Sequence, residues 1–111
     1  MSESELQHDI FAALGALPGV VCWRNNVGVA SQGEARVAYG VGGKGAPDLL
    51  VEVQRGSWWV AVWLEIKTPE GRVRPEQRAW HDAARRMGRH VFVVRSVQDA
   101  VEVVEGIRGG R

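Results

Sequence analysis

Two carboxylates and one lysine have the types and spacing of a metal-dependent catalytic site. Asp48 follows Pro47, and after a gap of sixteen residues comes Glu65-Ile66-Lys67. A hairpin joining these segments would bring the two acids together, and like charges that face each other across a strand ladder repel. A cation between them removes that repulsion, and ligands made of oxygen alone suit Mg²⁺ or Mn²⁺.

The turn of such a hairpin is marked by Gly56 followed by Ser57. Glycine supplies the positive φ that a two-residue primed turn requires. With these two residues at the tip, Asp48 lies directly opposite Glu65. Lys67 then shares the face of Glu65, because side chains alternate along a strand.

The side-chain pattern supports this register. Strands are expected at residues 48–54 and 58–67, and one of their two faces carries only Leu and Val, so it must be the core. Trp63 lies on the opposite face, beside the acids. We expect it to pack against the site rather than to stack on a base.

These residues resemble the motif of the PD-(D/E)XK nuclease superfamily. The glycine-rich stretch 40–50 and three further segments narrow the resemblance to the VRR-NUC (virus-type replication-repair nuclease) family. The three segments are Trp23-Arg24-Asn25-Asn26, Pro75-Glu76-Gln77 and Val94-Arg95-Ser96. An ordered set that runs along nearly the whole chain is far more specific than a lone Asp…Glu-x-Lys triplet.

The resemblance implies an α/β domain of the restriction-endonuclease-like type, with a mixed central sheet flanked by helices. It also implies roles for the residues of the motif. Asp48, Glu65 and the carbonyl of Ile66 would bind Mg²⁺ or Mn²⁺, and the metal would lower the pKa of a bound water. Lys67 would orient the attacking water and stabilise transition-state charge. Gln77 would help to position Lys67 or the water.

The first predicted helix offers one more acid. Residues 2–17 have an apolar stripe at helical spacing. Glu3 leans towards that stripe and precedes Leu6 by three, as does the first-helix acid of the nucleases that this chain resembles. Glu5 has capping-box spacing with Ser2. We therefore expect Glu3 rather than Glu5 at the metal, the alternative being an exposed first turn in which neither acid has that role.

The other elements follow from periodicity and from turn residues, and the whole chain, residues 1–111, is expected to form one domain. The second helical stretch should bury Trp80, Ala83, Ala84 and Met87. The expected elements are strands at 20–24, 36–39 and 91–95 and helices at 75–87 and 97–105.

Candidate DNA contacts surround the hairpin. The family pattern places Arg24, Asn25 and Asn26 near the site, although a plain turn explains them equally well. Lys44 lies in a loop with four glycines, whose backbone amides can approach a phosphate closely. A flexible connection is the alternative for this loop.

A row of arginines provides a second set of candidates. Arg78, Arg85 and Arg89 share one helix face, with Arg72 and Arg74 nearby. Such a row is usually only a solvated surface. Next to a metal site, we expect it to follow the phosphates of DNA.

Composition bounds the class of protein. The formal charge of +1 does not by itself indicate nucleic acid, and no apolar run is long enough for a membrane span or a signal peptide. The single Cys22 is expected to be a buried thiol. His8, His81 and His90 have no metal-ligand spacing and are expected to be non-catalytic. We expect a cytoplasmic protein of bacterial or phage origin.

The expected function is a Mg²⁺-dependent endonuclease that cuts branched DNA, such as four-way (Holliday) junctions, as a homodimer. Short VRR-NUC proteins resemble dimeric junction resolvases, and five tryptophans, two of them adjacent at Trp58-Trp59, leave apolar surface for a partner. The alternatives are an inactive DNA-binding module, a nuclease subunit of a larger complex, a flap nuclease and a structural interaction domain.

Overall fold

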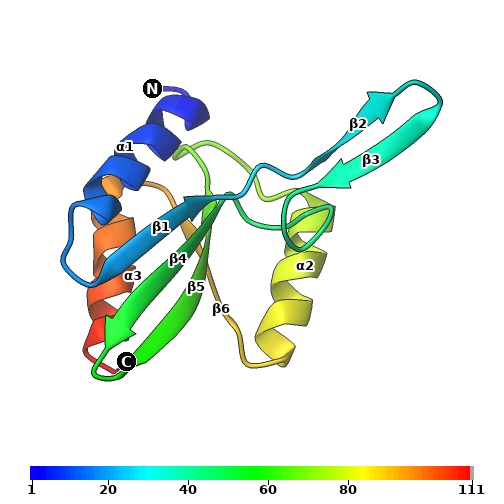
Figure 1. Cartoon of the computed structure of the whole chain (residues 1–111). Helices are drawn as coiled ribbons and strands as arrows, with labels where there is room; N and C mark the ends of the chain where they lie inside the picture. The colour runs from blue at the N-terminus through cyan, green and yellow to red at the C-terminus, as the bar shows by residue number, and fades with distance from the viewer. Residues whose placement is uncertain (111) are drawn as a thin grey trace.

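A four-stranded sheet forms the centre of the computed structural model, which describes residues 1–110 (Figure 1). Its strands are β1 (Val20–Arg24), β4 (Leu49–Arg55), β5 (Trp58–Ile66) and β6 (His90–Val94), in the order β1-β4-β5-β6. The first three pair antiparallel, and β5 and β6 pair parallel. The sheet is therefore mixed, as predicted.

Helices cover both faces of this sheet. Helices α1 (Glu3–Gly15) and α3 (Val97–Arg108) pack on one face and α2 (Pro75–Arg86) on the other (Figure 1). The remaining strands, β2 (Gly28–Gln32) and β3 (Ala35–Tyr39), form a separate two-stranded ribbon that projects from the body. The predicted α/β class with a sheet flanked by helices is confirmed.

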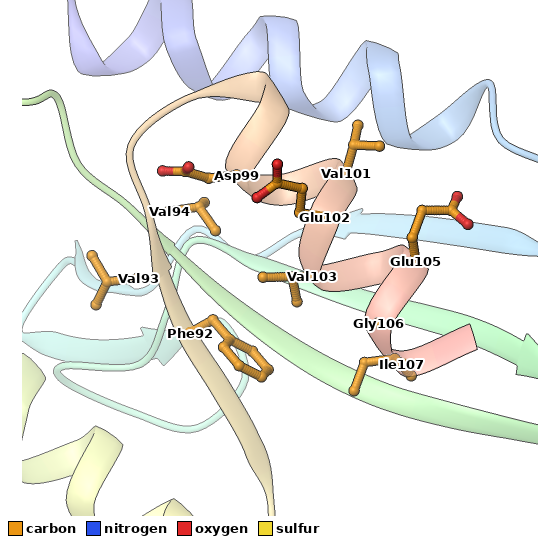
Figure 2. A pocket seen from close by; sticks show the side chains of 10 residues that line it. All are labelled: Phe92, Val93, Val94, Asp99, Val101, Glu102, Val103, Glu105, Gly106 and Ile107. Carbon is orange, nitrogen blue, oxygen red and sulfur yellow. The ribbon is translucent and has the colours of Figure 1, made fainter. Parts of the chain in front are cut away.

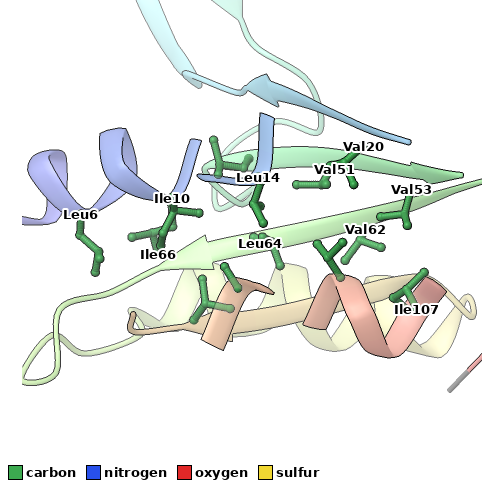
Figure 3. Close-up of a cluster of buried hydrophobic side chains, with 14 residues drawn as sticks. Leu6, Ile10, Leu14, Val20, Val51, Val53, Val62, Leu64, Ile66 and Ile107 are labelled. Atoms are coloured by element: carbon green, nitrogen blue, oxygen red, sulfur yellow. The ribbon is translucent and has the colours of Figure 1, made fainter. Parts of the chain in front are cut away.

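The predicted register of the β4–β5 hairpin is also confirmed. Leu49 pairs with Leu64 and Val51 with Val62, and Gly56 at the tip has a φ of 62°. These four leucine and valine side chains are fully buried in the core with residues of α1 and α3, and Figure 3 shows Val51, Val62 and Leu64 there. Burying one such side chain stabilises the fold by about 1.5–3 kcal/mol, so this face fixes the register of the hairpin.

Some predicted details are wrong. Strand β2 was not expected, since its residues are largely exposed and it owes its conformation to pairing with β3. Helix α3 extends beyond residue 105, because Ile107 continues its buried stripe. In α2, Met87 is 67% exposed, whereas Gln77 and His81 are buried. The helix is turned so that polar side chains face the sheet.

The face of the sheet under α2 is only partly covered. Trp63 packs against Trp80 of α2, with ring centroids 5.1 Å apart and an edge-to-face geometry. Farther along the same face, Trp23 and Trp59 are about half exposed. The sheet therefore keeps an open apolar area beyond the reach of α2.

Within residues 1–110, no helix has the length and apolar character needed to cross a lipid bilayer. Cys22 is half-buried rather than fully buried, and burial raises the pKa of its thiol to about 11. A thiol with so high a pKa remains protonated and is a poor nucleophile.

Candidate active site

The two acids of the motif meet where β4 begins and β5 ends. Asp48 immediately precedes β4, and its Oδ2 accepts a hydrogen bond from the backbone N–H of Ile66 at 2.8 Å. Glu65 is the next-to-last residue of β5 and is fully buried. The carboxylate of Asp48 thus bonds to the backbone beside Glu65 and is held against β5.

The electrostatics of Glu65 show that burial and Asp48 outweigh the positive charge near its carboxyl group. Burial, followed by a hydrogen bond with the Asp48 carboxyl group and the charge of that group, raises the pKa of Glu65 to about 9. The nearby Lys67 opposes this rise only in part. At neutral pH the metal-free site therefore holds a proton where an ordinary glutamate would be ionised.

Lys67 lies just beyond β5 and is buried, with 5% of its surface exposed. Its backbone N–H donates to the carbonyl of Val94 at 3.1 Å, which ties this end of β5 to β6. The structure thus brings Asp48, Glu65 and Lys67 together at one end of the hairpin, with Glu65 and Lys67 buried and Asp48 half-buried. A buried ammonium group beside two carboxyl groups can interact strongly with an anionic reactant.

The two acids of the first helix have different surroundings. Glu5 forms the predicted capping box: its N–H donates to Ser2 Oγ at 3.1 Å, and its Oε1 accepts from the Ser2 N–H at 3.4 Å. Glu3 is exposed, but its negative charge contributes to the raised pKa of Glu65. In the part of the chain that the structure describes, no three His, Cys, Asp or Glu side chains form a metal-binding group. A metal role for Glu3 stays a prediction.

Helix α2 provides two partners for Glu65. Gln77 Nε2 donates to Glu65 Oε2 at 3.3 Å, and Gln77 Oε1 accepts from the backbone N–H of Arg74 at 2.9 Å. Gln77 thus reaches the site as predicted, but its contact is Glu65 rather than Lys67. The same pairing with the Arg74 backbone caps the helix without a Ser or Thr.

The second partner, His81, was not expected at the site. Its Nε2 lies 3.2 Å from Glu65 Oε1, and both side chains are almost completely buried. Burial, and then the charge of Arg85, lowers the pKa of His81. The signal for this contact was present in the sequence, because His81 follows Gln77 by four residues and so lies on the same face of the helix.

Three predicted DNA contacts have other partners. Asn25 is buried, donates to the carbonyls of Val41 and Pro47 and accepts from the Val41 N–H, so its amide is committed to shaping the glycine-rich loop. Arg85 donates from Nε and Nη2 to the carbonyl of Val91. These hydrogen bonds favour a structural role for Asn25 and Arg85, and their predicted roles in DNA binding stay predictions.

Arg24 likewise turns towards the protein. Its guanidinium lies 4.8 Å from the ring centroid of Phe11, and its Nη2 is 3.4 Å from His8 Nδ1. Both partners belong to α1. Arg24 therefore links β1 to α1, and its predicted role in DNA binding stays a prediction.

A groove of about 580 Å³ extends from the β2–β3 ribbon to Asp48. Asp48 lies in its lining, and so do Asn26, Lys44, Arg74 and Gln77. The groove thus gathers residues predicted separately for catalysis and for DNA binding. Arg72, Arg78 and Arg85 lie outside it.

A hollow larger than this groove lies elsewhere. It has a volume of about 760 Å³ and lies between β6 and α3, where Figure 2 shows Phe92 and Val103 with Asp99 and Glu102 around it. None of the predicted site residues lines it. The groove beside Asp48 is therefore the candidate active site.

Comparison with known proteins agrees with this geometry. The family model of the VRR-NUC domain matches residues 2–98. The chain belongs to the VRR-NUC family. A solved structure titled a VRR-NUC domain is 28% identical to it, with a TM-score of 0.63, covering 93% of this chain and 94% of that chain. Comparison with curated proteins gave no match.

Membership of the VRR-NUC family makes the chain a nuclease domain with a restriction-endonuclease-like fold, and DNA is the substrate that such a domain implies. In this VRR-NUC domain, the Asp48 and Glu65-Ile66-Lys67 motif lies at one end of the β4–β5 hairpin. Helix α2 closes over it from one side through Gln77 and His81.

Proposed function

We propose that this VRR-NUC domain is an active endonuclease that hydrolyses phosphodiester bonds of DNA with Mg²⁺ or Mn²⁺. The observation that supports this most directly is the buried Glu65, whose pKa is raised to about 9 beside Asp48. Two ionised carboxyl groups that face each other where they are shielded from water destabilise the folded protein, and a divalent cation offsets their repulsion.

The residues present fit a hard cation. Asp48 offers carboxylate oxygens in the lining of a groove that a substrate can enter, and Glu65 lies buried beside it. The family adds the carbonyl of Ile66 as a ligand. When bound, the metal supplies a water of lowered pKa and neutralises charge that develops on the phosphate. Glu3, exposed at the start of α1, would hold the metal or one of its waters.

The other residues of the site would act on the reactants directly or through Glu65. The ammonium group of Lys67 would orient the attacking water and stabilise negative charge on the phosphate in the transition state. Gln77 would orient Glu65, to which it already donates a hydrogen bond.

DNA would lie along the groove, where Asn26, Lys44 and Arg74 meet its backbone. Arg72 and Arg78 would extend this contact. Arg78 is exposed on α2, and its charge already contributes to the lowered pKa of His81, so it lies near the site.

Arg78→Ala and Arg85→Ala form a matched pair on one helix. Arg78→Ala should weaken binding to all DNA sequences alike. It should also make the plot of log binding constant against log salt concentration less steep by about one unit, which corresponds to the loss of one phosphate contact. Arg85→Ala should leave this slope unchanged and lower the melting temperature, because Arg85 donates two hydrogen bonds to Val91. Salt titrations monitored by fluorescence anisotropy, together with thermal melts, test both. A normal slope for Arg78→Ala would contradict its DNA role.

The experiment that tests the function is a panel of labelled DNA structures incubated with Mg²⁺, Mn²⁺, Ca²⁺ or EDTA. Cleavage should require Mg²⁺ or Mn²⁺. Ca²⁺ should support binding with little cutting, because it is larger and less strictly octahedral. Undiminished cleavage in EDTA would refute the mechanism, and DNA binding without cleavage under every condition would favour an inactive module.

We also propose a homodimer that cuts branched DNA, such as four-way junctions. Resolving a junction takes two symmetric nicks, and a C₂ dimer supplies two active sites with the symmetry of the junction. Trp23, Trp58 and Trp59 expose 54%, 76% and 51% of their surface, which is unusual for tryptophan in a monomer. A nuclease that prefers flaps is the alternative that the panel of structures distinguishes.

The dimer has its own test. Light scattering on a sizing column should give about twice the 12.2 kDa chain mass. Trp59→Ser should shift the protein towards the monomer, whereas Val37→Ser, on the distant ribbon, should not. A wild-type protein that remains monomeric when bound to a junction would contradict the proposed assembly.

A further inference from the structure

The lining of the groove beside Asp48 contains an aromatic side chain, Tyr39, to which the proposed function assigns no role. We propose that this groove holds an unpaired nucleotide of the DNA substrate, with its base stacked on Tyr39. This inference rests on the proposed nuclease function and names the kind of DNA that reaches the acids.

Tyr39 is held at the edge of the groove by the ribbon itself. It ends β3 opposite Gly28, and a Cβ atom at Gly28 would lie 2.3 Å from the Tyr39 hydroxyl oxygen. A side chain at position 28 would force the ring to shift, so Gly28 lets the ring lie across the ribbon in its present position. The side chain lines the groove and is 49% exposed, so an aromatic surface is free to contact a ligand.

The glycine-rich loop, residues 40–46, forms another part of the groove lining, and its shape is fixed before any ligand binds. The Asn25 amide holds both the N–H and the carbonyl of Val41, and Trp80 Nε1 donates to the carbonyl of Gly42 at 2.8 Å. At Gly45, where φ is 91°, a Cβ would lie 2.4 Å from the carbonyl oxygen of Glu76. A preformed wall loses little conformational entropy on binding.

Charge and size favour a single strand. Lys44 and Arg74 can contact phosphates on the way to Asp48, which lies in the same lining. The volume of about 580 Å³ lies within the range of about 300–1,000 Å³ that holds small ligands, so the groove has room for one nucleotide. A base next to the phosphate at Asp48 would then contact Tyr39.

The test compares splayed-arm DNA, carrying 2-aminopurine in an unpaired arm, with blunt duplex, in Ca²⁺. The wild type should quench the fluorescence of 2-aminopurine and bind splayed-arm DNA more tightly than blunt duplex. Tyr39→Ala should lose the quenching and roughly 5- to 150-fold of this binding, since stacking on one aromatic ring is worth about 1–3 kcal/mol. It should bind blunt duplex as before. Tyr39→Phe, which keeps the ring, and Val37→Ala, outside the groove lining, should resemble the wild type.

The outcomes separate this inference from the proposed function. A wild type that binds neither DNA would contradict the proposed function. If the wild type binds both DNAs and Tyr39→Ala, shown to be folded by circular dichroism, keeps its preference for splayed arms, only the groove assignment is overturned. An equal loss on duplex and splayed DNA would overturn it as well.

A different contact carries a second inference. We infer that His81 is a positioning residue that holds the Glu65 carboxylate in the orientation needed for the metal. His81 Nε2 faces one carboxylate oxygen at 3.2 Å, and Gln77 Nε2 faces the other at 3.3 Å. Both partners come from one face of α2, so a single rigid element fixes both oxygens of Glu65. Loss of a residue that hydrogen-bonds to a metal ligand typically lowers metal affinity by about 10- to 100-fold.

His81→Leu and His81→Gln test this role by Mn²⁺ titration calorimetry. His81→Leu should weaken Mn²⁺ binding by about 10-fold or more. His81→Gln should restore most of the affinity, because its amide can donate to Glu65. His90→Leu, at an exposed position, is the control. A wild type that binds no Mn²⁺ would contradict the proposed metal site. If the wild type binds and folded His81→Leu binds equally well, only the positioning role is refuted.

Discussion

Replacement of Asp48, Glu65 or Lys67 should abolish DNA cleavage while the protein remains folded. Asp48→Asn, Glu65→Gln and Lys67→Met each keep the size of the side chain, and the first two can keep the hydrogen bonds to Ile66 and Gln77. Each should lower the single-turnover rate in Mg²⁺ by about 10²–10³-fold or more, as when one preorganised electrostatic partner of a transition state is removed.

The acids of the first helix provide an internal control for this result. Glu3→Ala should impair cleavage strongly at unchanged stability. Glu5→Ala removes half of the capping box with Ser2, so it should lower stability by up to about 1 kcal/mol and leave cleavage nearly intact. Equal losses of activity, or the reverse order, would show that the first-helix acid at the metal is not Glu3.

Glu65→Gln should also stabilise the metal-free protein at neutral and alkaline pH. The pKa of Glu65 rises from 4.5 to about 9 on folding. Between these values the folded state retains a proton that the unfolded state releases, so stability is greatest below the lower pKa and falls as the pH rises towards 9. At pH 7 the cost is on the order of 3 kcal/mol, from 1.36 kcal/mol for each unit of pKa.

Urea unfolding in EDTA at several pH values measures this effect. The wild type should lose stability between about pH 5 and pH 9, and Glu65→Gln should lose much less. Saturating Mg²⁺ should restore the wild type, because a ligand that binds only the folded state stabilises it, and should have little effect on Glu65→Gln. Parallel pH profiles for the two proteins would contradict the raised pKa of Glu65.

The hairpin could be predicted from the sequence because its signals are local. Gly56 fixes the turn, and the strict alternation of Leu49, Val51 and their partners fixes the face. Helix α2 could not be oriented in the same way. Its apolar side chains suggested that Met87 faces the sheet, but Met87 is exposed, and the helix instead turns Gln77 and His81 towards the buried carboxyl group of Glu65.

Arg85 also shows that sequence periodicity does not reveal the contacts of a long side chain. Periodicity assigns Arg85 to a row on the helix surface, but a long flexible side chain can turn back to a free carbonyl, here that of Val91. Asn25 is similar, since turn composition does not indicate which backbone groups an amide will bind. Such contacts depend on segments brought together only by the complete fold.

The β4–β5 hairpin carries core side chains on one face and Asp48, Glu65 and Lys67 on the other. Whether it tolerates an insertion or deletion therefore depends on whether the number of residues changed is odd or even. Deleting one residue within β5 would bring Ile66 to the place of Glu65 and turn the acid into the core. Removing whole cross-strand pairs near the exposed tip, beside Gly56, would shorten the hairpin and leave both faces unchanged. Length variation among chains of this kind is therefore expected at the tip and in even steps.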